Sequence, residues 1–461
     1  MPISIRRPSG RYTLQRRLLR PESVLAGGFL ALILLGSALL CLPSATISGK
    51  GLSFFDSLFT ATSAVCVTGL VAVDTGTTFS ALGQAVLLVL IQVGGLGFMV
   101  FTTLVLDLFG KRLSLQNRVL LRESMSGSSM NGLVRLTGVY CLIAFVIEGV
   151  GALLLAARLV PLYGPKGVWY SVFHSVSAFC NAGFDLFGGF SSLTSLRSDP
   201  VVILTVSALI ILGGTGFFVI FDVIANRFHW RALSLQSRLV LLFSGGLTLL
   251  GTLLLALCEW NNPATLAFEG SNTGTRLLDA FFQSVTMRTA GFNSIDLAAM
   301  TGASKLICIV LMFIGASPAS TGGGVKTTTM ALVLLAVWSV IRGYTDIHVM
   351  KKRLSGDLVR RALAIVTIAL MLMLLCTVVL TWAEHDRLDV IDLMFESASA
   401  MATVGVSTVG TPNLTFVSRV FLIPIMYLGR VGPLTLALAF ANKLDNTENR
   451  VRYPEDKLMI G

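Results

Sequence analysis

The feature of this sequence that most restricts its fold is a glycine-centred motif that occurs four times along the chain. The four copies are Val67-Thr68-Gly69-Leu70, Asn181-Ala182-Gly183-Phe184, Thr289-Ala290-Gly291-Phe292 and Thr403-Val404-Gly405-Val406. Their glycines are 114, 108 and 114 residues apart, and a phenylalanine precedes each glycine by nine or ten residues. Regular internal repetition indicates structural units of one kind placed side by side. The sequence therefore predicts a single chain folded fourfold around an axis.

The composition places these units in a membrane. Hydrophobic residues make up 54% of the 461 residues and charged residues only 13%, which is too apolar for an ordinary soluble domain. A helix needs about 20 apolar residues to cross the hydrocarbon core of a bilayer. Five uncharged stretches reach that length: 23–42, 82–106, 200–221, 239–258 and 362–383. Eight spans are expected in all, because three further stretches contain a single charged residue each: Glu148 in 136–157, Lys326 in 306–341 and Arg430 in 420–441.

Each repeated motif lies between two of these spans and follows a short apolar run. The four runs, at 54–65, 169–179, 277–287 and 390–401, are too short to cross a bilayer and are typical of re-entrant helices. The predicted fold is an all-α polytopic membrane protein, with eight transmembrane helices and four re-entrant pore helices arranged pseudo-fourfold around a central pore. The expected divisions are a basic N-terminal segment (1–22), repeat 1 (23–110), repeat 2 (111–227), repeat 3 (228–342), repeat 4 (343–442) and a C-terminal tail (443–461).

The basic residues indicate the orientation of the chain. Arginines and lysines gather before the first span and after the second, fourth, sixth and eighth spans, and with eight spans all these segments lie on one face. Because cytoplasmic loops carry an excess of Lys and Arg, both termini are expected in the cytoplasm. The same distribution argues against nucleic-acid binding in spite of the net charge of +11, since the basic residues lie at the ends of apolar spans.

The four loops suit the binding of a dehydrated alkali cation. Rings of backbone carbonyl oxygens can replace the water shell of such an ion, and irregular backbone at membrane depth is tolerated only where it is buried or lines a watery cavity. Glycine lets the carbonyls turn inward without an interfering Cβ atom. A preceding half-helix would also direct its partially negative C-terminus at the cavity below. The candidate cation ligands are therefore the sixteen residues of the four motifs.

The four motifs resemble a known class of ion filter. Thr403-Val404-Gly405-Val406 looks like a degenerate form of the potassium-channel filter, and four non-identical units of this kind in one chain resemble the Trk/Ktr/HKT superfamily of potassium transporters. Within that superfamily the Ktr B type of subunit is the nearer match, because the first unit begins close to Met1 and the C-terminal residues 453–457 look like the tail of that subunit.

The resemblance carries functional expectations. It implies uptake of K⁺, with Na⁺ as a second cation or coupling ion, across the inner membrane of a bacterial cell. It also implies a membrane homodimer and a separate cytosolic ring of nucleotide-binding regulatory subunits of the Ktr A type. Sodium-permeable plant members have serine in the first loop, so Gly69 favours potassium. No organic cofactor is expected on this chain.

The second span of repeat 3 contains a polar interruption at 315–329. Pro318 removes a backbone donor, and the run of Gly322, Gly323 and Gly324 weakens a helix, so this stretch is not one continuous helix. A phosphate-binding loop is disfavoured because Val325 separates the last glycine from Lys326. We interpret the whole stretch 315–329, which includes Gly315 and Lys326, as a gate beneath the loops, as the family resemblance also implies. A simple kink is the alternative.

Three basic residues lie where charge is costly, and each needs partners. Arg430 either projects into the pore as an electrostatic barrier next to the gate, which the resemblance implies, or pairs with Glu148 or Asp222. Arg288 precedes Gly291 by three residues, where a bare cation would repel potassium. We expect Arg288 to point behind the loop and to pair with Glu396. Lys326 belongs to the predicted gate.

A second glycine recurs in the second spans. Gly94, Gly213, Gly315 and Gly429 follow their loop glycines by 25, 30, 24 and 24 residues. Small residues let membrane helices approach closely, and a pore-lining role is an equally good interpretation of this pattern.

Two other classes of function compete with ion conduction. An enzyme would need converging acids, bases or metal ligands, but the four histidines are scattered and no zinc-protease motif is present. The stronger alternative is a secondary transporter that couples another cation or a small solute to sodium or protons. It is disfavoured because such folds usually carry inverted repeats, whereas these repeats all run in the same direction.

Overall fold

The computed structural model describes residues 21–97, 133–344, 346–350, 352–385 and 387–432. The predicted N-terminal segment, apart from its last two residues, lies outside this range, as do the junction between repeats 1 and 2, the end of the last span and the C-terminal tail.

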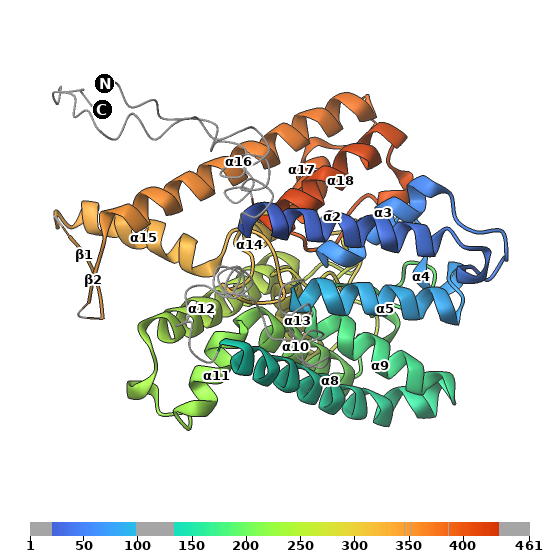
Figure 1. Cartoon of the computed structure of the whole chain (residues 1–461), viewed down its shortest axis with the longest axis horizontal. Coiled ribbons are helices and arrows are strands. Elements are labelled where there is room, and N and C mark those ends of the chain that lie inside the picture. The colour runs from blue at the N-terminus through green and yellow to red at the C-terminus, as the bar shows by residue number, and fades with distance from the viewer. Residues whose placement is uncertain (1–20, 98–132, 345, 351, 386, 433–461) are drawn as a thin grey trace, which may run out of the picture.

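The described chain is mostly helical, and its helices follow one order four times (Figure 1). Each repeat begins with a first helix: α2 (Pro21–Leu40), α8 (Leu133–Tyr163), α12 (Leu235–Glu259) and α16 (Gly356–Glu384). A short helix follows: α3 (Phe54–Cys66), α9 (Lys166–Phe179), α13 (Thr273–Thr286) and α17 (Val390–Met401). The second helices are α5 (Ala81–Leu96), α10 (Pro200–Thr215) with α11 (Phe217–Ala225), α14 (Gly302–Phe313) with α15 (Thr327–Ile341), and α18 (Phe416–Val431).

Among the described helices, α8, α12 and α16 are long and apolar enough to cross a membrane. The bent pair of α10 and α11 makes a fourth if it is taken as one span. Shorter apolar helices, α2, α3, α5, α14 and α15 among them, complete the bundle.

The remaining elements connect these helices. A short helix, α4 (Thr75–Thr78), and four 3₁₀ turns, Pro43–Ala45, Thr194–Leu196, Trp230–Ala232 and Thr411–Asn413, lie in the loops. Strands β1 (Ile347–Val349) and β2 (Lys352–Leu354) pair antiparallel, with Ile347 opposite Leu354. This hairpin joins α15 to α16 and lies at one end of the molecule, away from the bundle (Figure 1).

Side-chain caps fix where the second helices begin. Ser80, Asp199, Thr301 and Thr415 precede α5, α10, α14 and α18, and each accepts a hydrogen bond from a backbone N–H of the first helical turn. Such caps satisfy amide groups that have no partner within the helix. All four second helices therefore begin by the same device, at equivalent positions after their loops.

The second helices end or bend at an equivalent glycine in three repeats. Gly97, Gly216 and Gly432 have φ of +87°, +96° and +95°, a conformation that a right-handed helix does not use. At Gly216 the chain bends by 95° between α10 and α11. The stretch 200–221 is therefore not one straight helix, contrary to the prediction. Helices α5 and α18 end at Leu96 and Val431, and the rest of their predicted spans, 98–106 and 433–441, lies outside the described residues. In repeat 3 the equivalent position is Pro318.

The recurring second-span glycines serve close packing. A Cβ atom added at Gly94, Gly213 or Gly429 would clash with a main-chain carbonyl oxygen at the end of the short helix in the same repeat, namely that of Val65, Phe179 or Met401. Without a side chain, the second helix can lie directly against the short helix and hold the following loop in place. Gly315 differs, because it packs against the carbonyl of Gly323 in the interrupted segment.

Candidate functional site

The four glycine-centred loops meet in a closed ring, which we call the loop ring (67–70, 181–184, 289–292 and 403–406). A Cβ atom added at Gly69 would lie 2.5 Å from the carbonyl oxygen of Ala182, and one at Gly183 would lie 2.8 Å from that of Ala290. One at Gly291 would lie 2.6 Å from the carbonyl oxygen of Val404, and one at Gly405 would clash with Thr68. Each repeat thus touches the next, and the fourth returns to the first.

The backbone repeats the same unusual conformation in every loop. The four glycines have φ between +69° and +95°. The residue two positions earlier also has positive φ: 55° at Val67, 59° at Asn181, 73° at Thr289 and 52° at Thr403. Valine and threonine rarely adopt this region because of their branched Cβ atoms. Strain of this kind persists only where the surroundings impose it, and it concentrates at functional sites.

Hydrogen bonds to the short helices set the direction of one set of carbonyl groups. The amides of Thr68, Ala182, Ala290 and Val404 donate to the main-chain oxygens of Ser63, Ser177, Thr286 and Ser399, at 2.7 to 2.9 Å. In a planar trans peptide the C=O points opposite to the N–H. The carbonyls of the preceding residues, Val67, Asn181, Thr289 and Thr403, therefore point away from the short helices toward the space that the four loops share.

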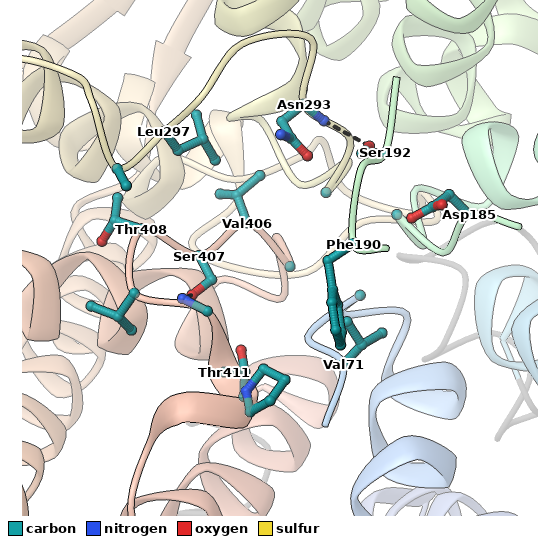
Figure 2. Close-up of a pocket in the computed structure, with 18 of the residues that line it drawn as sticks. Val71, Asp185, Phe190, Ser192, Asn293, Leu297, Val406, Ser407, Thr408 and Thr411 are labelled. Atoms are coloured by element: carbon teal, nitrogen blue, oxygen red, sulfur yellow. Dashed lines mark hydrogen bonds between the residues drawn. The ribbon is translucent and has the colours of Figure 1, made fainter. Parts of the chain in front are cut away.

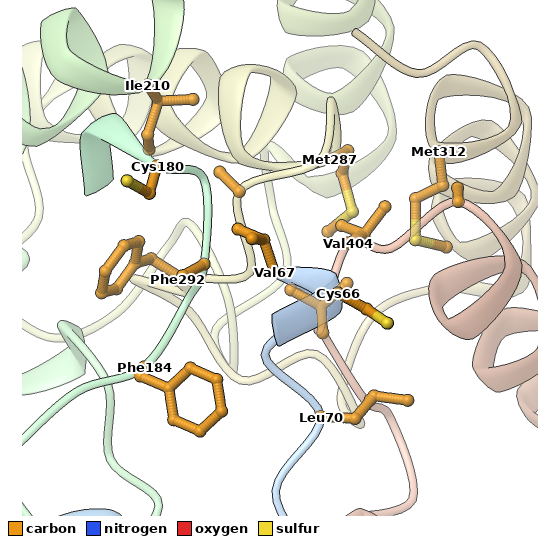
Figure 3. Packing of buried hydrophobic residues seen from close by; sticks show 14 of the residues in the cluster. Cys66, Val67, Leu70, Cys180, Phe184, Ile210, Met287, Phe292, Met312 and Val404 are labelled. Atoms are coloured by element: carbon orange, nitrogen blue, oxygen red, sulfur yellow. The ribbon is translucent and has the colours of Figure 1, made fainter. Parts of the chain in front are cut away.

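Hydrophobic side chains of the loop ring pack into the core around it. Val67, Phe184, Phe292 and Val404 are completely buried and belong to the hydrophobic core (Figure 3). Because these side chains pack outward, the ring is lined by backbone at the level of its four glycines, whereas the Thr289 and Thr403 hydroxyls lie below it near Gly322 and Gly323. Such an interior offers carbonyl oxygens, which are hard, uncharged ligands suited to an alkali cation. In the described part of the chain, no group of three or more His, Cys, Asp or Glu side chains could hold a metal ion.

A vestibule of about 410 Å³ leads to one side of the ring. Its walls come from all four repeats, and Asn293 donates to Ser192 Oγ at 3.1 Å across the boundary between repeats 2 and 3 (Figure 2). Its acidic and glycine lining residues are Gly69, Asp74, Gly183, Asp185, Gly291, Asp296, Gly405 and Gly410. The carboxylates favour cations at the entrance to the ring.

The interrupted segment of repeat 3 lies on the opposite side of the ring. We call residues 314–326, between α14 and α15, the break segment. A Cβ atom added at Gly322 would clash with Thr289 Oγ1, and one at Gly323 with Thr403 Oγ1. Gly324 packs near Ala402. The segment thus occupies the space under the loop ring. The predicted boundary 315–329 is too long at its end, because 327–329 already belong to α15.

The break segment is held by hydrogen bonds to repeat 2. The Thr321 amide donates to the Gly213 carbonyl at 3.3 Å, and its hydroxyl donates to the Phe179 carbonyl at 3.1 Å. Ser317 N donates to Gly214 O at 3.0 Å. The carbonyl of Pro318 lies against Gly216, where α10 ends. The bend at Gly216 therefore provides room for the break segment.

Two partly buried cations accompany this segment. The Arg430 guanidinium donates to the carbonyl oxygens of Thr321 in the break segment and of Gly94 and Gly95 in α5. Lys326 Nζ donates to Gly322 O at 2.7 Å. The suggested pairing of Arg430 with Glu148 or Asp222 is wrong, since carbonyl groups supply its contacts.

The two carboxylates proposed for Arg430 have other partners. Gln92 Nε2 donates to both Glu148 oxygens, at 2.9 and 3.1 Å. Asp222 accepts from Ser234 N at 3.0 Å and from Ser237 Oγ, and so holds the start of α12.

Arg288 points behind the loop ring, as expected, but its predicted partner is wrong. Its guanidinium donates to Ser244 O at 3.1 Å and Ser244 Oγ at 3.0 Å, and lies 3.4 Å from Thr248 Oγ1, all in α12. Glu396 instead accepts from Thr411 Oγ1 at 2.7 Å. Arg288 bonds to α12 because α12 packs directly against α13, the helix that precedes Arg288.

Sequence reasoning missed the glycines that end the second helices. Gly97, Gly216 and Gly432 each follow a recurring glycine by three residues, so a Gly-x-x-Gly pair was the available signal. It also missed Thr321, whose carbonyl binds Arg430. Nothing in the sequence distinguishes Thr321 from the other small polar residues nearby.

Comparison with known proteins assigns the chain to a family. A family model described as a cation transport protein, TrkH, matches residues 28–451. The chain belongs to the TrkH family of cation transport proteins. It is therefore a membrane transporter rather than an enzyme.

Several TrkH-family relatives match nearly the whole chain. It is 39% identical to the Ktr system potassium uptake protein B of Bacillus subtilis, over 96% of this chain and 97% of the relative. It is 38% identical to the potassium/sodium uptake protein NtpJ of Enterococcus hirae, over 97% of this chain and 98% of that relative. It is 40% identical to the Ktr system potassium uptake protein B of Vibrio alginolyticus, over 94% of this chain and 93% of that relative.

A solved structure shares the fold. The crystal structure of the potassium transporter TrkH from Vibrio parahaemolyticus matches with a TM-score of 0.67 at 18% identity, over 90% of this chain and 85% of that one.

Proposed function

We propose that this protein takes up potassium ions across the cell membrane and that the loop ring is its selectivity filter. The observation that carries the proposal is the closed ring of four glycine loops with backbone on the inside. Carbonyl groups in such a ring substitute for the water shell of K⁺. Relatives of this chain are named potassium uptake proteins, and one is named for potassium and sodium. Potassium is the principal cargo, with sodium as a second cation.

The break segment acts as the gate in this proposal. It fills the space under the ring and is tied to Arg430. A guanidinium in this position adds an electrostatic barrier to cation passage. Movement of residues 314–326 away from Thr289 and Thr403 would open the pathway.

The wider architecture follows from the same proposal. The chain forms eight spans with both termini in the cytoplasm, and two copies form a homodimer. Relatives of this chain are subunits named for a Ktr system. We therefore propose that a separate regulatory subunit of the nucleotide-binding Ktr A type binds its cytoplasmic face.

Rubidium uptake into vesicles that contain the purified protein tests the proposed function. Excess potassium should compete with radiolabelled rubidium, and sodium should compete less well. Replacing Gly69, Gly183, Gly291 or Gly405 by Ser should weaken the preference for potassium over sodium, because an added side chain displaces the neighbouring carbonyl. Unchanged ion discrimination in all four variants would remove the filter assignment.

The secondary-transport alternative has a separate test. Uptake would be measured with and without sodium and across an imposed proton gradient. A strict requirement for one of these gradients would favour coupled transport, whereas flux that follows the potassium gradient alone would favour conduction.

A further inference from the structure

The loop ring carries an asymmetry in the hydroxyl groups behind it. Ser63, Ser177, Thr286 and Ser399 occupy equivalent places near the ends of the four short helices, and all four are fully buried. Their main-chain oxygens accept a hydrogen bond from a loop amide in every repeat. Their hydroxyl groups make different hydrogen bonds in different repeats, and this difference divides the ring into two halves.

In repeats 1 and 4 the hydroxyl is an acceptor. Gly69 N donates to Ser63 Oγ at 3.0 Å, and Gly405 N donates to Ser399 Oγ at 3.0 Å. The carbonyl in the same peptide unit points the opposite way. These bonds therefore hold the carbonyl groups of Thr68 and Val404 toward the inside of the ring.

In repeats 2 and 3 the hydroxyl is a donor. Ser177 Oγ donates to the carbonyl of Phe184 at 2.8 Å, and Thr286 Oγ1 donates to the carbonyl of Phe292 at 2.6 Å. Both carbonyls are thereby turned backward, away from the passage. The next amide agrees with this direction in repeat 3, where Asn293 N donates to Ser192 Oγ on the vestibule side (Figure 2).

The equivalent residues of the other two repeats are Leu70 and Val406. Neither carbonyl accepts a hydrogen bond from another group in the described part of the protein. Repeats 1 and 4 are neighbours in the ring, since Gly405 packs against Thr68. The free carbonyls thus lie side by side on one half of the vestibule end.

We propose that the outermost cation position is one-sided, with Leu70 and Val406 as its protein ligands, and that Ser177 and Thr286 withdraw the other two carbonyls. This inference rests on the proposed function, because it concerns the same filter. It removes Phe184 and Phe292 from the four outer ligands expected from the sequence. A cation at this position completes its shell with vestibule water, so this position binds more weakly than those formed by four carbonyls.

Anomalous scattering from thallium, which replaces potassium, tests this in crystals of the full-length protein. The expected result is strong density between two rings of carbonyl oxygens, one from Val67, Asn181, Thr289 and Thr403 and the other from the residue that follows each of them. At the level of Leu70 and Val406 the density should be weak and off the axis. Strong axial density there, with the Phe184 and Phe292 carbonyls as ligands, would overturn the inference and leave the proposed function intact. No thallium density anywhere in the ring would overturn both.

Two variants test the part of the hydroxyls. In the double variant Ser177→Ala with Thr286→Val, the carbonyls of Phe184 and Phe292 lose their hydroxyl donors. The Phe184 carbonyl becomes free to turn inward, and the Phe292 carbonyl is then held only through the bond from Asn293 N to Ser192 Oγ. We expect outer thallium density to rise and the KM for rubidium uptake to fall several-fold. The matched control, Ser177→Thr with Thr286→Ser, keeps both hydroxyls and should behave like the original protein. An unchanged outer density and KM in the first variant would contradict the assignment.

The opposite half of the ring supplies a comparison. Replacing Ser63 and Ser399 by Ala leaves the amides of Gly69 and Gly405 without an acceptor, which is costly for a buried donor. We expect lower uptake and no gain of outer density. Equal effects of the two pairs on KM would show that the four hydroxyls are equivalent and would reject the proposed asymmetry.

Discussion

At the scale of single residues, Arg430 shows how a partly buried guanidinium can be stabilised without an acidic partner. Its contacts are carbonyl groups from α5 and from the break segment. A planar guanidinium has five donors, so it can bridge several carbonyls at once. A carboxylate would neutralise it, whereas carbonyls leave its positive charge in place beside the passage. In the proposed function, Arg430 would act both as a clamp on the break segment and as a barrier to cations.

Replacing Arg430 by Ala should therefore raise rubidium uptake several-fold. The change removes the charge and releases Thr321, and it should lower the free energy of unfolding by about 1–3 kcal/mol through lost hydrogen bonds. Uptake and thermal stability would be measured on the same preparation. Arg430→Lys, which keeps the charge, should restore part of the barrier. Reduced uptake by a stably folded Ala variant would argue against a role in closing the pathway.

Asp185 gives the vestibule a predicted pH dependence. Burial raises the pKa of Asp185 to about 7, and the nearby charge of Asp74 adds to the rise. The carboxyl is therefore neutral below about pH 7 and charged above it, so the KM for potassium should be higher at pH 6 than at pH 8. The raised pKa means that the folded state holds the proton more tightly than the unfolded state. The resulting stabilisation is present at low pH and is lost as pH rises through 7.

The variant Asp185→Asn should remove this pH dependence and give a KM close to the acidic value at every pH. Asp296→Asn is a suitable control, because Asp296 also lines the vestibule. It should raise the KM while the pH dependence persists. A pH profile unaffected by the change at Asp185 would assign the titration to another group.

At the scale of elements, the second helices owe their position to missing side chains. Gly94, Gly213 and Gly429 let them rest on the ends of the short helices, and these contacts support the loops that follow. Glycine weakens a helix by about 0.5–1 kcal/mol relative to alanine. Here the close approach of backbone to backbone outweighs that loss.

Replacing Gly429 by Ala should consequently destabilise the protein by about 1–3 kcal/mol, as overpacking does in other cores. The added Cβ atom would clash with the carbonyl of Met401, which cannot move without disturbing the fourth loop. Gly246→Ala is the matched control, because Gly246 in α12 has no atom within 4 Å of an added Cβ. Thermal unfolding in detergent would compare the two, and equal stability would contradict the packing role.

The sequence predicted the short helices to within a few residues, since apolar runs of fixed length precede each glycine motif. It did not predict the bend at Gly216, because an apolar run such as 200–221 carries no hydropathy signal for a turn. The partner of Arg288 was also missed. That choice depends on which helix packs behind α13, and Ser244 is far from Arg288 in sequence. The ring itself was predictable because repetition reveals which segments are equivalent.

At the scale of the whole molecule, the break segment links three of the four repeats. It belongs to repeat 3, binds the carbonyls of Phe179 and Gly213 in repeat 2, and contacts Thr403 and Arg430 in repeat 4. A change in any of these repeats can therefore alter the position of the segment under the ring.

Deleting Gly322 to Gly324 should shorten the segment and raise rubidium uptake in reconstituted vesicles. The deletion removes the glycines that lie against the side chains of Thr289 and Thr403, so the shortened segment should leave the space under the ring. Thermal stability, measured in parallel, would identify a misfolded product. Unchanged or abolished uptake in a well-folded variant would count against a gating role.

The closure of the ring by one continuous chain also has an evolutionary consequence. In an assembly of four identical subunits, a single mutation changes all four pore segments at once. Here each quarter is encoded separately, as Val67, Asn181, Thr289 and Thr403 already illustrate. Ion preference can accordingly drift in small increments, one loop at a time, while the other three keep the protein working.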